Sequence, residues 1–300
     1  MSVNVNVAFV QTYSTNVQML LQQQGSRLRD SVNVMPLTGK AATVAEQFGS
    51  VAPVKNSGRH SDTPLISTPQ DKRWIFPNDY DWADLIDNQD KLRMLIDPAS
   101  PYAMAGAWAM GRAIDDEVIG AFFGDAKTGE NGTTTTTFPA GQIVANTVGA
   151  TAATGLNVAK LRAAKKLLLQ SEVDVDNVPL YIAINAVQHD NMLGDPQVNS
   201  TDYNNRAVLV DGKIASFVGF NFIHSERTFG SPSCTQPGTV AGTYKIPVWA
   251  KSGVVLGMWN DVSTSVDRRA DKRNSHQVYV TGTFGATRVE ELQVVQIAAV

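Results

Sequence analysis

The acidic run Asp115, Asp116 and Glu117 is the densest group of side chains that could perform acid–base chemistry or bind magnesium. It lies in a stretch whose apolar residues follow helical spacing. Successive helix residues point about 100° apart, so three adjacent carboxylates cannot converge on one ion. We interpret the run as an exposed face or an intersubunit salt bridge, and we predict no catalytic role for it.

Other reactive side chains also lack the partners that chemistry requires. His189, Asp190 and Asp195 could be drawn as a metal cluster, but their spacing better fits a solvated helix end. Cys234 lies in a Ser-Pro-Ser-Cys loop, and no motif pairs it with His224. Neither a phosphate-binding loop nor a Gly-x-Ser-x-Gly turn occurs. The sequence therefore predicts a protein that is not an enzyme, without cofactor or metal.

One basic cluster stands out, formed by Arg268, Arg269 and Arg273 with Lys272 among them. Acidic residues interleave with it, so we expect a solvated turn or a site that pairs with a neighbour's acids. The formal net charge of -3 disfavours tight, sequence-specific binding of nucleic acid.

Composition limits the class of protein further. The 300 residues, 43% of them hydrophobic, can build a substantial core and two subdomains. A single cysteine excludes an internal disulfide framework and fits a reducing cytosol. We find no run of about 18 apolar residues and no signal-peptide pattern, so we predict an intracellular protein without a membrane span.

The first 45 residues cannot form a core of their own, and the segment after them predicts a ribbon. Residues 3–7 alternate Val and Asn, the period of a half-buried strand, and the rest of the first 45 residues reads as an arm. The pattern of residues 49–82 predicts a long two-stranded ribbon. An isolated ribbon is only marginally stable in water, so we expect it to pack against another surface. Its polar tip carries the charged residues Lys55, Arg59, His60 and Asp62, which we expect to be candidates for intersubunit contacts.

Two helices are expected next, a short one over residues 82–96 and a long one over 101–123. Pro98 disfavours helix at the residue before it, Ser100 can cap the long helix, and Pro101 suits its first position. One face of the long helix is apolar and should be buried. That face comprises Met104, Trp108, Ile114, Val118 and Phe122, with smaller residues between them.

The remaining chain alternates helix and strand patterns. A hairpin or extended loop is expected at 129–138, a helix at 155–171, a strand at 178–184, a short helix at 187–194, and a hairpin at 206–217 turning at Asp211-Gly212. Strand patterns return at 246–250, 254–258, 278–283 and 289–300, and we expect these strands to cover the long helix. Residues 145–245 would then be an inserted unit.

This order of elements resembles the major capsid proteins of tailed double-stranded DNA bacteriophages, with the Hong Kong 97-type fold. Three segments carry the resemblance: 97–124, which is similar to the spine helix; 158–168 with 179–184, similar to the first helix and strand of the axial domain; and 281–297, similar to the closing strands of the peripheral domain. The resemblance implies an α+β fold with an N-arm (1–47), an extended β-ribbon loop (48–80), a peripheral domain (81–144 and 246–300) and an inserted axial α/β domain (145–245).

The resemblance also implies a function. Such proteins self-assemble as pentamers and hexamers into an icosahedral shell that encloses packaged double-stranded DNA. We would expect assembly in the host cell cytoplasm and a final place in the virion capsid. Expected partners are other copies of the chain, a separate scaffolding protein (because the arm begins at Met1), a portal, an optional decoration protein, and DNA bound without sequence specificity. The alternatives are an encapsulin-like nanocompartment shell and a cytosolic α/β ligand-binding protein or enzyme.

Overall fold

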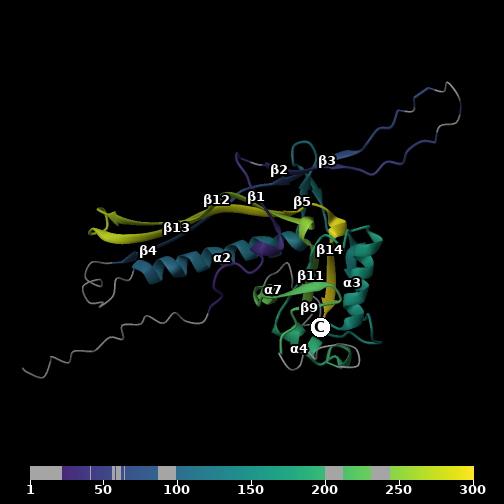
Figure 1. The fold of residues 1–300 in the computed structure, drawn as a ribbon. Coiled ribbons are helices and arrows are strands. Elements are labelled where there is room, and N and C mark those ends of the chain that lie inside the picture. Colours follow the sequence, from purple (N-terminus) through teal and green to yellow (C-terminus); the bar gives the residue numbers. More distant parts are fainter. Residues whose placement is uncertain are drawn as a thin grey trace, which may run out of the picture. The chain divides into compact units, whose positions relative to one another are not determined.

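The computed structural model describes residues 22–40, 42–55, 58, 62–63, 65–86, 99–199, 212–230 and 244–300. They form two compact units (Figure 1). Unit 1 is built from residues up to 26, 79–112 and 260–282, and unit 2 from 27–78, 113–259 and 283–300. Four elements contribute residues to both units: β4 (Asn78–Ile86), whose first residue belongs to unit 2, α2 (Ala99–Phe123), β12 (Val254–Arg269) and β13 (Ser275–Arg288).

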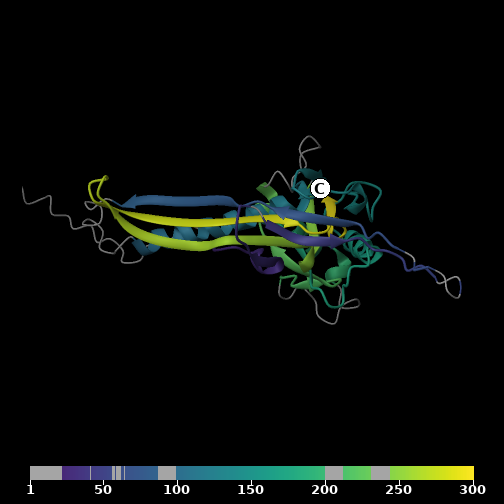
Figure 2. The same cartoon turned by 90° about the horizontal axis from the view of Figure 1, so that it is seen from above.

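Unit 1 packs the first half of α2 along β4 (Asn78–Ile86) and the outer parts of the β12–β13 hairpin (Figures 1 and 2). The helix approaches the strands closely at Gly106, where an added Cβ would lie 2.6 Å from the side chains of both Trp82 and Val280. Across the strands, the Tyr279 hydroxyl donates to Asp81 Oδ1 at 2.5 Å. This hydrogen bond keeps the pKa of Asp81 below its usual range.

The prediction of a helix over residues 82–96 is wrong at its start, because residues 82–86 belong to β4. Exposure alternates along this strand, with Trp82 turned inward and Leu85 outward. A period of two residues rather than 3.6 therefore governs the segment. The remainder of the predicted helix, residues 87–98, lies outside the described part of the chain.

Unit 2 is organised around a six-stranded mixed sheet covered on one side by α3 (Val158–Gln170). Apolar side chains from the helix and the sheet, among them Leu161, Leu168, Ile182, Val248 and Ile297, form one core. The strand order is β7 (Ile143–Val144), β14 (Val294–Ala299), β11 (Tyr244–Ala250), β8 (Leu180–Ile184), β10 (Phe220–His224) and β9 (Ser216–Phe217).

Local caps explain where the helices of unit 2 begin. Asn157 accepts a hydrogen bond from the Lys160 amide at 2.8 Å, which caps α3. Asn185 and Gln188 form a reciprocal capping box at the start of α4 (Ala186–Leu193). The short helical segments are α5 (Pro196–Asn199), α7 (Arg227–Gly230), η1 (Arg29–Ser31), η2 (Ala140–Gln142), η3 (Lys251–Gly253) and η4 (Glu291–Gln293).

A smaller four-stranded sheet in unit 2 forms the base of the predicted ribbon. Its order is β2 (Ala42–Phe48), β3 (Gln70–Ile75), β5 (Ala126–Thr128) and β6 (Thr134–Thr136). The β5–β6 pair confirms the hairpin alternative predicted at the Asn-Gly turn. Gly132 in that turn has a φ of 67° and lies against Trp74. Upstream, β1 (Asn33–Pro36) pairs with β12 in parallel.

One further prediction differs from the structure, and a second falls largely outside the described residues. Strands β11 and β14 belong to the same sheet as β8, so this sheet crosses the boundary expected at residue 245 between the inserted unit and the returning strands. One residue of β11, Trp249, does pack on α2 as expected, against Phe122. The hairpin turn expected at 211–212 falls at the edge of the described residues. The turn that the structure describes is Val218-Gly219, with φ of 54° and 86°, between β9 and β10.

The predicted apolar face of the long helix is buried only towards its C-terminal end. Ile114, Val118 and Phe122 are buried and Trp108 is half-buried. Met104 is 48% exposed, so the prediction that it is a core residue is wrong for the single chain. Met104 lies in the half of α2 that belongs to unit 1, whereas the buried residues of this face, Ile114, Val118 and Phe122, belong to unit 2.

We predict that Phe122→Ala destabilises the protein by about 3–5 kcal/mol. The Phe122 ring is fully buried and lies 4.4 Å from the Trp249 ring between centroids, so its removal leaves a cavity. Met104→Ala is the matched control on the same helix and should cost less than about 1 kcal/mol. Urea unfolding of dissociated subunits measures both; similar losses would contradict this account of the helix.

We also predict a pH-dependent stability difference at Lys160. Its buried ammonium donates to the carbonyl oxygens of Thr154 and Gly155 at 2.5 and 2.9 Å, and burial lowers its pKa to about 8. Because the unfolded chain binds this proton more tightly between pH 8 and 10.5, folding stability should rise with pH across that window. Relative to Lys160→Met, the wild type should gain about 2–3 kcal/mol between pH 7.5 and 10.5. A difference that does not change with pH in urea unfolding would contradict the prediction.

Candidate assembly surfaces

The ribbon begins where β2 and β3 stop pairing. The antiparallel register ends with Phe48 opposite Gln70, followed by one further bond from the Gly49 amide to the Pro69 carbonyl at 2.8 Å. Beyond it, the described residues up to 68 form no strand. This part of the chain exposes several apolar side chains, namely Phe48, Val51, Val54, Leu65 and Ile66. The Leu65 side chain is 97% exposed, so almost none of its apolar surface is buried within the single chain.

A buried arginine, Arg73, fixes the root of the ribbon. Arg73 on β3 is 3% exposed; its Nη2 lies 2.6 Å from Glu291 Oε2, and its Nε donates to the Val289 carbonyl at 2.9 Å. Gln47 on β2 donates to the same carbonyl. Both strands of the ribbon are thereby attached to the connection between β13 and β14.

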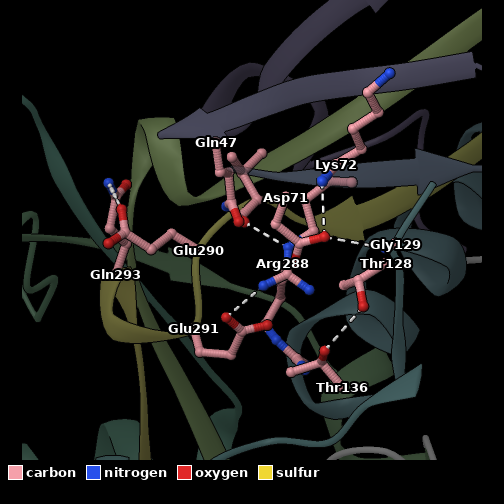
Figure 3. A network of polar contacts seen from close by, with 12 residues as sticks. Gln47, Asp71, Lys72, Thr128, Gly129, Thr136, Arg288, Glu290, Glu291 and Gln293 are labelled. Carbon is pink, nitrogen blue, oxygen red and sulfur yellow. Dashed lines mark hydrogen bonds and ion pairs between the residues drawn. The ribbon is translucent and has the colours of Figure 1, made fainter. Parts of the chain in front are cut away.

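β3 is also attached to the β5–β6 hairpin. Asp71 Oδ1 accepts hydrogen bonds from the Lys72 amide at 2.8 Å and from the Gly129 amide at 3.0 Å. Trp74 Nε1 donates to the Gly129 carbonyl at 2.7 Å. Figure 3 shows Asp71 beside Gly129, with the Thr128–Thr136 contact next to it. The ribbon root is therefore held by two separate segments.

A second buried arginine joins this region to the end of α2. Arg288 Nη1 donates to the carbonyls of Phe122 and Gly124 at 3.0 and 2.5 Å, where helix carbonyls lack partners. A cation at the C-terminal end of a helix is also favoured by the helix dipole. The guanidinium lies over the Phe138 ring, 5.3 Å from its centroid. Burial lowers the pKa of Arg288, and the charge of Glu291 opposes that shift.

The acidic run on α2 proves to be a set of internal contacts in unit 2. Asp115 is fully buried and accepts from the amides of Arg27 and Leu28 at 3.1–3.2 Å. The interpretation of Asp115 as an exposed or intersubunit residue is therefore wrong. Sequence spacing alone cannot reveal that a distant loop supplies two amide donors to it.

Its two neighbours are also engaged within the chain. Asp116 Oδ1 accepts from Arg227 Nε at 2.7 Å, in a bidentate pair that leaves both side chains partly exposed. Glu117 Oε1 accepts from Asn78 Nδ2 at 2.9 Å. The three carboxylates point to three separate partners, in agreement with the expectation that they do not converge on one ion.

The charged residues proposed as intersubunit contacts have varied surroundings. Lys55 and Asp62 are exposed, whereas Arg59 and His60 lie outside the described residues. At the turn after β12, Arg268, Arg269 and Arg273 are all exposed. Arg269 pairs with Asp271 at 2.8 Å, and this interaction lowers the pKa of Asp271 to about 2.

Sequence reasoning missed Arg73, Arg288 and Glu291, the residues that position the ribbon. A weak signal existed, because Arg73 and Arg288 each stand beside apolar or β-branched residues in strand-like segments. A charge at an inward position of a strand is uncommon and requires a partner. Which carboxylate supplies it depends on contacts across more than 200 positions of sequence.

Two searches for other kinds of site gave negative results within the described ranges. There, no group of three or more His, Cys, Asp or Glu side chains is arranged to hold a metal ion. Nor does any helix in these ranges have the length and apolar character needed to cross a membrane.

Comparison with known proteins agrees with the fold. Residues 5–300 match the family model described as phage capsid protein, and the chain belongs to that family. It is a structural subunit of a phage capsid and not an enzyme. A search of curated proteins found no match.

Solved capsid structures share the fold at low sequence identity. The capsid of cyanophage P-SCSP1u is 15% identical, covers 98% of this chain and 93% of its own, and gives a TM-score of 0.75. The cyanophage Pam1 capsid is 10% identical, with coverages of 99% and 98% and a TM-score of 0.70. The bacteriophage PhiM1 mature capsid is 11% identical, with coverages of 97% and 91% and a TM-score of 0.68.

We predict that Glu291→Gln destabilises the subunit by about 3–5 kcal/mol, because it leaves the buried Arg73 guanidinium without a compensating charge. Glu290→Gln removes the same charge one position away, on an exposed side chain, and should cost less than about 1 kcal/mol. Urea unfolding of dissociated subunits distinguishes the two. Equal effects would mean that the Arg73–Glu291 pair does not hold the ribbon root.

Proposed function

We propose that this chain is the major subunit of an icosahedral shell, assembled as pentamers and hexamers around packaged double-stranded DNA. Membership of the phage capsid family supports the shell. The observation that carries self-association is the exposed apolar surface of the ribbon, above all the 97% exposure of Leu65. A rooted segment that leaves apolar side chains exposed in its own chain is stabilised if a neighbouring copy covers them.

The energetic basis is the hydrophobic effect. Burying apolar surface contributes about 25 cal/mol per Å², so a covered leucine and isoleucine pair contributes several kcal/mol per subunit. Repeated contacts around a closed shell add such contributions for every subunit. The buried Arg73–Glu291 pair supports the proposal, since a fixed root limits the orientations of the ribbon and reduces the entropy lost on docking.

The domain roles follow the family resemblance. We assign residues 1–47 to the N-arm, 48–80 to the extended loop, 81–144 and 246–300 to the peripheral domain, and 145–245 to the axial domain. The spine helix is placed at 101–123. These boundaries describe roles in a shell, and they differ from the two compact units of the single chain, which divide α2 near its middle.

The remaining partners are proposed from the same resemblance. They are a scaffolding protein during assembly in the host cytoplasm, a portal, an optional decoration protein, and DNA held without sequence specificity. A net charge of -3 supports the last point, because tight phosphate binding needs clustered lysine and arginine. Lys55, Asp62, Arg268 and Arg273 remain candidate contacts between subunits, and Asp115 does not.

We predict that Leu65→Asp blocks or strongly impairs shell formation while leaving the subunit folded. The aspartate would place a charge at the surface that a neighbour is proposed to cover, without touching the core. Ser67→Asp, two residues along the same exposed segment, adds the same charge as the matched control. Electron microscopy under assembly conditions counts closed shells, and circular dichroism checks the fold. Normal shells from Leu65→Asp would exclude this residue from the contact, and the absence of closed shells from the wild type would overturn the proposed function.

A further inference from the structure

The outer half of β12, residues 260–269, belongs to unit 1 and lies at the edge of its sheet (Figures 1 and 2). One edge of β12 pairs with β13, and the other pairs with β1 only at residues 255–258. Within the described ranges, no strand lies on that second edge from residue 262 to the end of β12. A strand edge of this kind presents backbone N–H and C=O groups that can pair with another strand.

The side chains of this half-strand are exposed as well. Every residue from 263 to 269 is exposed, and Val266 is 46% exposed. The centre of the edge, residues 262–266, reads Val-Ser-Thr-Ser-Val and carries neither a charge nor a proline. Natural sheet edges that avoid pairing usually carry one or the other. The centre therefore lacks the residues that commonly block strand addition, and its β-branched side chains favour a strand.

The sequence of this edge reads the same in both directions. Asp261-Val-Ser-Thr-Ser-Val-Asp267 is a palindrome about Thr264. When two copies of a strand pair antiparallel about a two-fold axis perpendicular to the sheet, the axis passes between two copies of one residue. With the axis at Thr264, this residue faces its counterpart and each valine of the centre faces a valine. Such β-branched cross-strand pairs stabilise a sheet, so the edge is complementary to itself.

Other positions of the axis fit less well. Moving it to the serine on either side of Thr264 places a valine opposite Arg268 or Asn260. The register centred on Thr264 has one unfavourable feature, because Asp261 lies opposite Asp267 of the second copy at both ends. Like charges directly opposite each other destabilise a strand pair. This repulsion limits the pairing of free subunits, and its removal gives a direct test of the register.

We propose that the outer edge of β12 pairs antiparallel with the same edge of a second copy of this chain, with the two-fold axis at Thr264. The inference rests on the proposed self-assembly and adds one specific contact to it. Backbone hydrogen bonds across the axis would join the sheets of the two copies, as in other cases of strand addition. The alternative occupant is the Val-Asn alternation of residues 3–7, which lie outside the described part of the chain. A second copy is favoured because one contact satisfies two identical edges.

Single cysteines test the register in shells of the full-length protein carrying Cys234→Ser. Directly opposite residues of antiparallel strands have Cα atoms about 4.5–5.5 Å apart, within the range of about 4.4–6.8 Å that a disulfide spans. Thr264→Cys should therefore form covalent dimers on mild oxidation. Val262→Cys and Val266→Cys are the matched controls, because each would lie about 13 Å from its own counterpart. Each alone should crosslink roughly tenfold less than Thr264→Cys, and mixing the two variants should restore the crosslink.

The pairing and the proposed function can fail separately in this experiment. Closed shells seen by electron microscopy without a crosslink at Thr264→Cys would overturn the pairing and leave the proposed function standing. Equal crosslinking at all three positions would also overturn the pairing, since it indicates that no register is fixed. A crosslink from Thr264→Cys to Val5→Cys, in place of one to itself, would assign the edge to the N-terminal segment. The absence of closed shells would count against the proposed function.

The opposed aspartates provide an independent measurement, the dimer affinity of dissociated subunits in analytical ultracentrifugation. Asp267→Asn removes two opposed carboxylate pairs in each dimer and keeps an oxygen that can accept from Ser265 Oγ. It should tighten the dimer roughly twofold to 30-fold. Asp176→Asn removes the same charge from an exposed side chain of unit 2 and should leave the affinity unchanged. An Asp267→Asn dimer no tighter than this control contradicts the pairing about Thr264.

Discussion

The buried ion pair between Arg73 and Glu291 is the interaction on which the ribbon depends. A two-stranded ribbon has too little contact area to hold a direction by itself. Arg73 on β3 fixes the root of the ribbon, because its buried guanidinium binds the Glu291 carboxylate and donates to the Val289 carbonyl. A charge buried at this position must remain paired, which makes the geometry of the root specific. The apolar side chains beyond the root can therefore stay exposed on a segment whose base is fixed.

Arg288 extends the same constraint to the helix. Its guanidinium occupies the C-terminal end of α2, where it satisfies carbonyls that no helical amide can reach. Arg288 and Glu291 are separated by only two residues, so the capped helix and the ribbon root meet at one short connection between β13 and β14. Near the middle of α2, Asp115 accepts hydrogen bonds from the amides of Arg27 and Leu28. These bonds attach the segment around residue 27 to the helix. Within unit 2, polar groups at both places tie separate segments to this helix.

These contacts also explain why the acidic run on α2 forms no reactive site among the described residues. The acidic side chains that are closest in sequence serve as hydrogen-bond acceptors and ion-pair partners, and each faces a different donor. The described surface offers exposed apolar residues and separated charged groups instead. Such features suit contacts between protein copies, in keeping with membership of the phage capsid family.

The sequence by itself determined the long helix, the helix α3 and the buried strand β8, and it offered a hairpin as one of two alternatives at the Asn-Gly turn, since each depends on spacing or turn chemistry within a few residues. It also led to the correct family through the order of these elements. Only the tertiary structure decided that residues 82–86 are strand, that β11 and β14 join the sheet of β8, and that Asp115 is buried. It alone identified Arg73 and Arg288 as the residues at the ribbon root. The reason is physical: a local pattern sets the preferred backbone, but the partner of a buried charge or of a sheet edge comes from a segment distant in sequence, and only folding brings the two together.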